Sequence, residues 1–105
     1  MKNYSNYYAT EQGIICSKLN DKQMRVWTDK GTKGGYMRVK LTRDDGKRVH
    51  WRVSRFIYTY FLGAIPGGFE IDHIDGNRTN NALYNLRMVT HEQNIALRDK
   101  VRVIA

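Results

Sequence analysis

A chain of 105 residues is large enough for one folded domain and too short for two catalytic domains. Its 41% hydrophobic and 27% charged residues are ordinary for a globular protein and exclude a wholly disordered chain. Lys and Arg outnumber Asp and Glu by 18 to 10, which gives a formal net charge of +8 and predicts anionic partners such as nucleic acid.

The single cysteine, Cys16, excludes an intramolecular disulfide and a Cys-rich zinc site, and it is typical of a reducing compartment. We expect it to be a small buried side chain. The first residues lack the apolar segment of a secretory leader, and the chain has no apolar run of the roughly 18 residues that a membrane span requires. The sequence therefore predicts a cytoplasmic protein without a membrane partner.

Residues 1–12 are polar and rich in tyrosine without a clear period, so we expect an N-terminal arm without regular structure. Residues 13–53 are predicted to form a basic β region. This region begins with strand-like runs at 14–16 and 24–27, and a glycine-rich break at 31–35 follows them.

An Asp-Gly dipeptide at 45–46 is the strongest turn signal, and it separates strand-like runs at 36–41 and 47–53. Because side chains alternate across a strand, Arg38 and Lys40 share one face of this predicted hairpin. The basic face predicts a ribbon that contacts DNA phosphates, and a solvated outer sheet face is the alternative. The candidate DNA contacts are Arg38, Lys40, Arg48 and Arg52, to which the later segment adds Arg78 and Arg87.

Residues 54–69 are predicted to form a helix and a loop, with Ser54 as the N-cap and Gly63 at the stop position. The spacing of four apolar residues would place them on one face of this helix; they are Phe56, Ile57, Tyr60 and Phe61. We expect this face to pack under the sheet rather than to hold a cofactor.

Residues 70–100 are predicted to form a strand at 70–74, an Asp-Gly-Asn turn with an Asn-rich loop, a strand at 86–89 and a closing helix. Thr90 and Gln93 have the spacing of a capping box, which places the start of the helix there. The unit brings the first strand and the helix together, so side chains distant in sequence can share one cation.

This last segment combines a carboxylate, an imidazole and several amides, which suits metal-dependent cleavage of a polyanion. Asp72 and Asn94 would fill part of an octahedral shell and leave places for water and phosphate oxygens, as Mg²⁺ prefers, whereas zinc sites favour Cys and His. His73 is the candidate base, because an imidazole with an ordinary pKa near ~6.5 is largely neutral at neutral pH. Since Asp72 and His73 are adjacent, the strand must end or twist there if both face one site.

Four groups of residues together resemble the HNH endonuclease family, in particular its phage and intron-associated homing members. The groups are Ile71 to Asn77, Asn80 with Asn81, Asn85 to Arg87, and Thr90 to Asn94. The resemblance implies an α+β fold, in which an N-terminal antiparallel β-hairpin region and a helix precede a ββα-metal (His-Me finger) unit at residues 70–100.

The resemblance also implies roles for individual residues. Asp72 and Asn94 are the implied ligands of a divalent ion, Mg²⁺ or Mn²⁺, with His73 as the general base and Asn85 fixing the His-bearing loop. Asn94 replaces the last His of the family name, as in other homing-type members, and we expect Asn94→Asp to be tolerated better than Asn94→Ala because it keeps an oxygen ligand. His91, three residues earlier on the same helix face, is the alternative ligand or base.

Two functions are left open by the residues themselves. The first is a DNA endonuclease that cuts one strand or both, and the presence of the whole set of site residues favours it. The second is a non-catalytic DNA-binding protein of the β-ribbon type whose nuclease site is degenerate. In both cases the expected partner is DNA, bound by a monomer or a homodimer with a single domain over residues 1–105.

Overall fold

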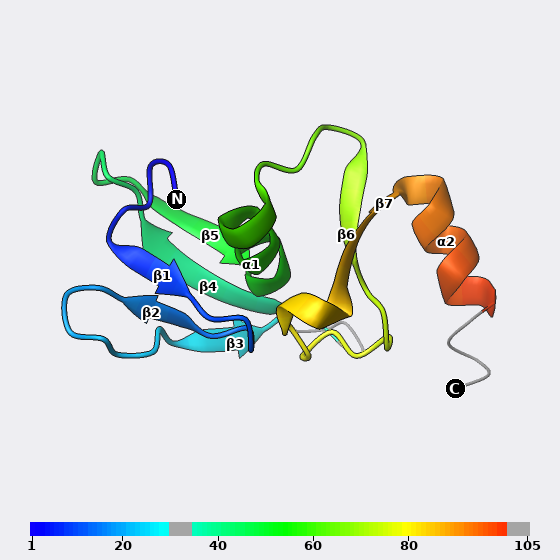
Figure 1. The fold of residues 1–105 in the computed structure, drawn as a ribbon, viewed down its shortest axis with the longest axis horizontal. Helices are drawn as coiled ribbons and strands as arrows, with labels where there is room; N and C mark the ends of the chain where they lie inside the picture. Colours follow the sequence, from blue (N-terminus) through cyan, green and yellow to red (C-terminus); the bar gives the residue numbers. More distant parts are fainter. Residues whose placement is uncertain (30–34, 101–105) are drawn as a thin grey trace.

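Three small antiparallel sheets and two α-helices follow one another in a computed structural model that describes residues 1–29 and 35–100 (Figure 1). The first two sheets consist of β1 (Tyr7–Ala9) with β2 (Ile15–Ser17), and of β3 (Val26–Thr28), β4 (Met37–Thr42) and β5 (Arg48–Arg52). After them come α1 (Val53–Leu62), the paired strands β6 (Phe69–His73) and β7 (Leu86–Thr90), and α2 (His91–Lys100). This order confirms the predicted α+β class. Most of the predicted glycine-rich break at 31–35 lies outside the described residues.

The N-terminal residues do not form the expected arm. β1 pairs with β2, and the side chains of Tyr4 and Tyr7 are buried. The Tyr4 ring packs edge-on against Trp51 at 5.4 Å and against Phe56 at 6.2 Å, while the Tyr7 hydroxyl accepts a 2.9 Å hydrogen bond from the backbone N–H of Thr42. The prediction was wrong because a strand of three residues is too short to show a period, and these tyrosines serve as core residues with a polar tip.

The hairpin of β4 and β5 is confirmed, with Gly46 in its turn at φ +90°. Val39 and Leu41 are 0% exposed, whereas Lys40 points to solvent, so the predicted alternation holds. Arg38 pairs directly with Arg52 across the ladder, which places both on the outer face with Lys40. Cys16 is buried and free, as predicted.

α1 begins at Val53, directly after β5, rather than after a cap at Ser54. Arg52 occupies the N-cap position in an extended conformation without a side-chain cap, and Ser54 is inside the helix and buried. The prediction of a Ser54 cap was wrong because the strand continues into the helix without a loop. Gly63 ends the helix at φ +101°, as predicted.

The buried face of α1 connects the second sheet to the third. Phe56 and Ile57 are 0% exposed and belong to one hydrophobic cluster with Leu41 of β4, Ile71 of β6 and Leu86 of β7. In Figure 1, α1 accordingly lies between the N-terminal sheets and the β6/β7 pair, and α2 lies at the far end. The strand that carries Asp72 and His73 is therefore fixed to the main core of the protein.

The capping box of α2 is also confirmed. The backbone N–H of Gln93 donates to the Thr90 hydroxyl at 3.1 Å, and the backbone N–H of Thr90 donates to the Gln93 side-chain oxygen at 2.9 Å. Neither helix within residues 1–29 and 35–100 has the length and apolar character needed to cross a bilayer.

Gly13 brings the turn between β1 and β2 against the loop that precedes β7. It has φ +92°, and a Cβ added there would lie 2.6 Å from the backbone of Asn81. Nearby, the carbonyl of Glu11 accepts a 2.7 Å hydrogen bond from the backbone N–H of Leu83. The N-terminal sheet therefore supports the Asn-rich loop directly.

Gly13→Ala is expected to lower the free energy of unfolding by about 1–3 kcal/mol, because the substitution strains the backbone and pushes on Asn81. Gly46→Ala is the matched control, since Gly46 has φ +90° but no atom within 4 Å of the added Cβ. Urea unfolding of both variants measures the difference. An equal loss in both would mean that the contact with Asn81 contributes nothing to stability.

Candidate active site

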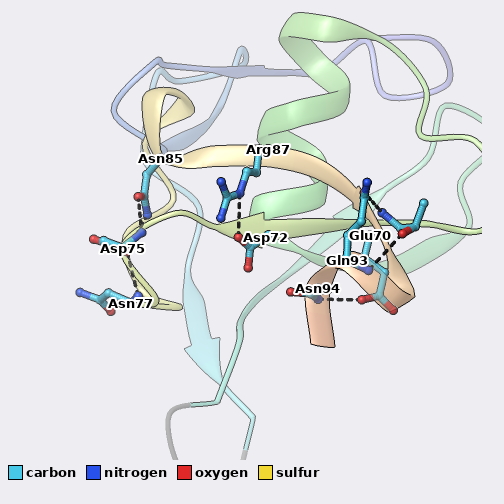
Figure 2. Close-up of polar contacts among 9 residues, drawn as sticks. Glu70, Asp72, Asp75, Asn77, Asn85, Arg87, Gln93 and Asn94 are labelled. Atoms are coloured by element: carbon cyan, nitrogen blue, oxygen red, sulfur yellow. Dashed lines mark hydrogen bonds and ion pairs between the residues drawn. The ribbon is translucent and has the colours of Figure 1, made fainter. Parts of the chain in front are cut away.

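Asp72 is the penultimate residue of β6 and is paired with Arg87 in the β6/β7 ladder. Its side chain is only 2% exposed, and its Oδ2 accepts a 2.9 Å hydrogen bond from Nε of Arg87 (Figure 2). Burying a carboxylate is costly unless a counter-charge and hydrogen bonds accompany it, and Arg87 supplies both. The structure thus gives Arg87, predicted as a DNA contact, an ion-pair partner inside the site.

His73 is the last residue of β6 and is 4% exposed. Its Nε2 donates a 2.8 Å hydrogen bond to the side-chain oxygen of Asn81, since an amide oxygen can only accept. Burial lowers the pKa of His73 below its ordinary value, while the bond to Asn81 and the charge of Asp72 oppose this effect. The imidazole is therefore neutral at neutral pH.

Asp72 and His73 line one small pocket in spite of the alternation along a strand. The pocket is lined by Tyr36, Ile71, Asp72, His73, Gly76, Arg78 and Asn94. Both side chains reach it because β6 ends at His73, where the chain turns into the loop. This agrees with the expectation that the strand ends at this point.

Asn85 is buried and holds the loop that follows His73. Its side chain accepts from the backbone N–H of Asp75 at 3.0 Å and donates to the Asp75 carboxylate and to the carbonyl of Asn80, both at 2.9 Å. Its own carbonyl accepts from the N–H of Ile74 at 2.8 Å. Asn85 thus forms hydrogen bonds with three residues of the loop that follows His73.

Asp75 is a residue of this loop whose contribution the sequence reasoning missed. Its carboxylate accepts a hydrogen bond from the side chain of Asn80 at 2.9 Å. It also accepts one from the backbone N–H of Asn77 at 2.8 Å (Figure 2). The hydrogen bond from Asn80 holds the pKa of Asp75 below its usual range, so the carboxylate remains an acceptor at neutral pH. The Asn-rich spacing after an Asp-Gly turn is the signal that could have revealed this network.

Asn94 lies on α2 and is 8% exposed. Its Nδ2 donates a 2.7 Å hydrogen bond to Glu70, whereas its Oδ1 is buried without a hydrogen-bond partner. In Figure 2 this oxygen points to the side on which the Asp72 carboxylate lies. Burying an oxygen without a hydrogen-bond partner costs about 1–3 kcal/mol of stability, and binding a cation would offset this cost. The Oδ1 of Asn94 is therefore suited to be a metal ligand.

The donor set also fits a hard cation. A carboxylate and an amide oxygen are ligands that Mg²⁺ and Mn²⁺ accept, with water and phosphate completing the shell. Among the described residues, no group of three or more His, Cys, Asp or Glu side chains is arranged to hold a metal ion.

His91, the alternative ligand or base, is 64% exposed and donates from Nδ1 to Glu70 at 2.8 Å. It lies outside the pocket that Asp72 and His73 line. Glu70 thus joins His91 and Asn94, which the sequence reasoning did not foresee. Its position two residues before Asp72, on the same face of the strand, is the signal that could have indicated it.

A groove of about 380 Å³ adjoins the pocket and shares Tyr36, Ile71 and Asn94 with it. Arg52 and Arg55 contribute two cationic side chains to its wall. The other predicted DNA contacts are more scattered. Arg38 forms an ion pair with Asp29, Lys40 and Arg48 are exposed on the outer sheet face, and Arg78 lines the pocket.

Comparisons with known proteins place the chain in a family. Residues 52–96 match a family model of HNH endonucleases. The chain is 34% identical over 88 residues to the SPbeta prophage-derived putative HNH homing endonuclease YosQ of Bacillus subtilis (strain 168), and 31% identical over 96 residues to the DNA endonuclease I-HmuI of Bacillus phage SP01. A solved structure describing DNA binding and cleavage by the HNH homing endonuclease I-HmuI matches the fold with a TM-score of 0.77, at 26% identity.

The chain belongs to the HNH endonuclease family. These alignments cover 84% and 90% of the chain but 49% and 53% of the two curated relatives, so the chain spans about half of their length. The structural match covers 97% of the chain and 59% of the solved structure.

The HNH family model includes all of the predicted site residues from Arg52 onward, whereas β1 to β4 precede it. The alignment with I-HmuI nevertheless extends over nearly the whole chain. The N-terminal sheets are therefore shared with that relative.

Proposed function

We propose that this chain carries the catalytic site of a metal-dependent DNA endonuclease that hydrolyses a phosphodiester bond, with His73 as general base and Asp72 and Asn94 as metal ligands. The observation that carries the proposal is the buried Oδ1 of Asn94, which has no hydrogen-bond partner and belongs to a residue that lines the same pocket as Asp72 and the neutral His73. Membership of the HNH family supports it.

Mg²⁺ or Mn²⁺ is the proposed cofactor. When bound, it supplies positive charge where negative charge accumulates on the phosphoryl and leaving oxygens. The chain contributes the orientation of both ligands, because Arg87 holds one oxygen of Asp72 and Glu70 holds the amide nitrogen of Asn94. The proposed donors are the Asp72 carboxylate and the Oδ1 of Asn94, with Arg87 and Glu70 as the residues that orient them.

His73 is proposed to take a proton from the attacking water. With Nε2 donating to Asn81, the basic nitrogen of the neutral ring is Nδ1. Burial keeps the ring neutral, and the network of Asn85 and Asp75 holds the following loop in place. These residues thus present a base of fixed tautomer to the pocket.

The DNA strand is proposed to lie in the groove beside the pocket. Arg52 and Arg55 give the groove the charge that a phosphate backbone requires, and Asn94 and Tyr36 connect it to the pocket. Within the described residues the proposed base and ligands line a single pocket, so each encounter of a monomer with DNA is expected to cut one strand.

Plasmid nicking tests the proposal. Supercoiled DNA should be relaxed in Mg²⁺ or Mn²⁺ and remain intact in EDTA, because the reaction requires the divalent ion. His50→Ala removes an exposed imidazole from the outer sheet face, far from the pocket in the ladder register, and as a control variant it should nick normally at saturating DNA. A protein that binds the plasmid but leaves it intact with every divalent ion would instead be the non-catalytic DNA-binding protein.

A separate prediction concerns the contribution of the basic side chains on the outer sheet face to DNA affinity. Lys40→Gln and Arg48→Gln should each lower the slope of log affinity against log salt by roughly 0.9, because both side chains are exposed. Arg38→Gln should lower it less, since Arg38 already pairs with Asp29. Fluorescence anisotropy in EDTA at several salt concentrations measures the slopes. An unchanged slope in all three variants would show that this face is only solvated.

A further inference from the structure

Tyr36, just before β4, contacts two arginines that are far apart in sequence. The guanidinium carbon of Arg52, from the end of β5, lies 3.9 Å from the ring centroid, and that of Arg78, from the loop after β6, lies 4.3 Å from it. The same ring is 6.1 Å from the ring of His73 and lines both the pocket and the groove. A phenol ring thus joins two cations at the edge of the proposed catalytic site.

The position of Tyr36 is fixed by backbone contacts. Its carbonyl accepts a 3.1 Å hydrogen bond from the N–H of Asp29, and the Asp29 carboxylate in turn pairs with Arg38. At Gly35 an added Cβ would lie 2.6 Å from the carbonyl oxygen of Asp29, so the chain approaches itself closely there. The backbone of Tyr36 is therefore held at the end of the β3/β4 ladder, from which its ring extends to the two arginines.

Two guanidinium groups beside one ring repel each other, and the negative face of the ring offsets part of this repulsion. A phosphate oxygen placed near both would add charge-assisted hydrogen bonds, for which the planar guanidinium is well suited. All three side chains are half-buried, so the surrounding dielectric is lower than that of water and such contacts are strengthened.

We propose that Tyr36 holds Arg52 and Arg78 as a paired guanidinium site for the DNA phosphate next to the one that is cut. Arg52 and Arg78 bind this flanking phosphate, and Tyr36 is a positioning residue that fixes the distance between the two arginines. The inference rests on the proposed nuclease function, and it adds a specific subsite beside His73 that sets where the strand lies.

The alternative is that the ring only packs the two arginines and stabilises the loop. The two cases differ in what happens to individual DNA phosphates. If the subsite exists, replacing one phosphate beside the cut with a neutral methylphosphonate weakens binding to the wild type. The same replacement has little effect on binding to a variant that lacks the subsite.

The position at which the wild type nicks DNA is first mapped. The test then uses a set of duplex oligonucleotides that contain this position, each with one methylphosphonate at a different place around it. Binding is measured by anisotropy in EDTA, so the result does not depend on turnover. Tyr36→Leu is expected to weaken binding about tenfold and to lower the salt slope by roughly 0.9 to 1.8, the loss of one or two phosphate contacts. Tyr36→Phe, which keeps the ring, should restore both.

Arg52→Gln combined with Arg78→Gln should reproduce the loss, and adding Tyr36→Leu to that pair should cause no further loss. If Tyr36→Leu does not fold, the double variant of Arg52 and Arg78 still tests whether the phosphate subsite exists. Arg43→Gln, which removes one charge at the β4/β5 turn, is the matched control for charge alone. Normal salt slopes in Tyr36→Leu, or equal sensitivity to every methylphosphonate in the wild type and the variants, would overturn the subsite. An inactive wild type would overturn the nuclease function instead.

Discussion

Replacing His73 with alanine is expected to lower the rate of plasmid nicking by about 10² to 10⁴ at saturating DNA, because the proposed general base is lost. DNA affinity in EDTA should change little, since the ring is 4% exposed and offers almost no surface to the DNA. Single-turnover kinetics with wild type and variant measure the rate, and anisotropy measures the affinity.

Two further variants make this result specific. His91→Ala removes the exposed imidazole that pairs with Glu70, and it should lower the rate far less than His73→Ala does. Asn81→Ala keeps the His73 ring but removes the acceptor of its Nε2 proton, so an intermediate loss is expected. Near-normal turnover in His73→Ala would refute the assignment and make His91 the candidate base.

The second large effect is expected at the proposed metal ligands. Asp72→Ala should reduce metal-dependent nicking by roughly 10² or more, because it removes a charged ligand and leaves Arg87 unpaired beside the site. Titration calorimetry with Mn²⁺ in the absence of DNA provides a readout that does not depend on activity. Activity with Zn²⁺ alone, and not with Mg²⁺ or Mn²⁺, would contradict the oxygen-ligand set.

Asn94 offers a sharper test, in which the structure changes the expectation from sequence. Asp at this position keeps an oxygen ligand, but its carboxylate would face Glu70, which accepts from the Asn94 amide at 2.7 Å. Two carboxylates at that distance repel, so we expect Asn94→Asp to bind Mn²⁺ poorly as a single change. Adding Glu70→Gln restores a donor opposite the new carboxylate and should recover binding.

The recovery in the double variant is the decisive outcome for Asn94. Asn94→Ala has no oxygen to offer, so Glu70→Gln should not rescue it. If Asn94→Ala bound Mn²⁺ as well as the wild type, Asn94 would not be a ligand, and its buried oxygen would require another explanation.

Features that depend on neighbouring residues could be predicted from the sequence. The turn at Gly46, the end of α1 at Gly63 and the capping box of Thr90 and Gln93 each rest on local backbone chemistry, and the structure has all three. The same holds for the order of strands and helices after β1, since hydrophobic alternation and turn residues are read over short windows. The α+β architecture followed from these local features together with the family resemblance.

Contacts set by register and packing could not be predicted in this way. The pairing of Asp72 with Arg87 follows from the β6/β7 register, and the contact of Glu70 with Asn94 requires the orientation of α2 against β6. Tyr36 reaches His73 only because the end of the β3/β4 ladder is packed beside the loop after β6. Each of these contacts depends on how segments that are remote in sequence lie in space, and a single sequence does not contain that information.

The contact of Gly13 with Asn81 bears on how this protein can be divided. Asn81 holds the proton on Nε2 of His73, and the turn between β1 and β2 presses on the backbone of the same Asn81. A fragment trimmed to the family match at residues 52–96 would keep every proposed ligand and the base, yet it would lack the surface against which the loop is set. Anyone transplanting this nuclease unit into a fusion protein should therefore carry the chain from its first strand.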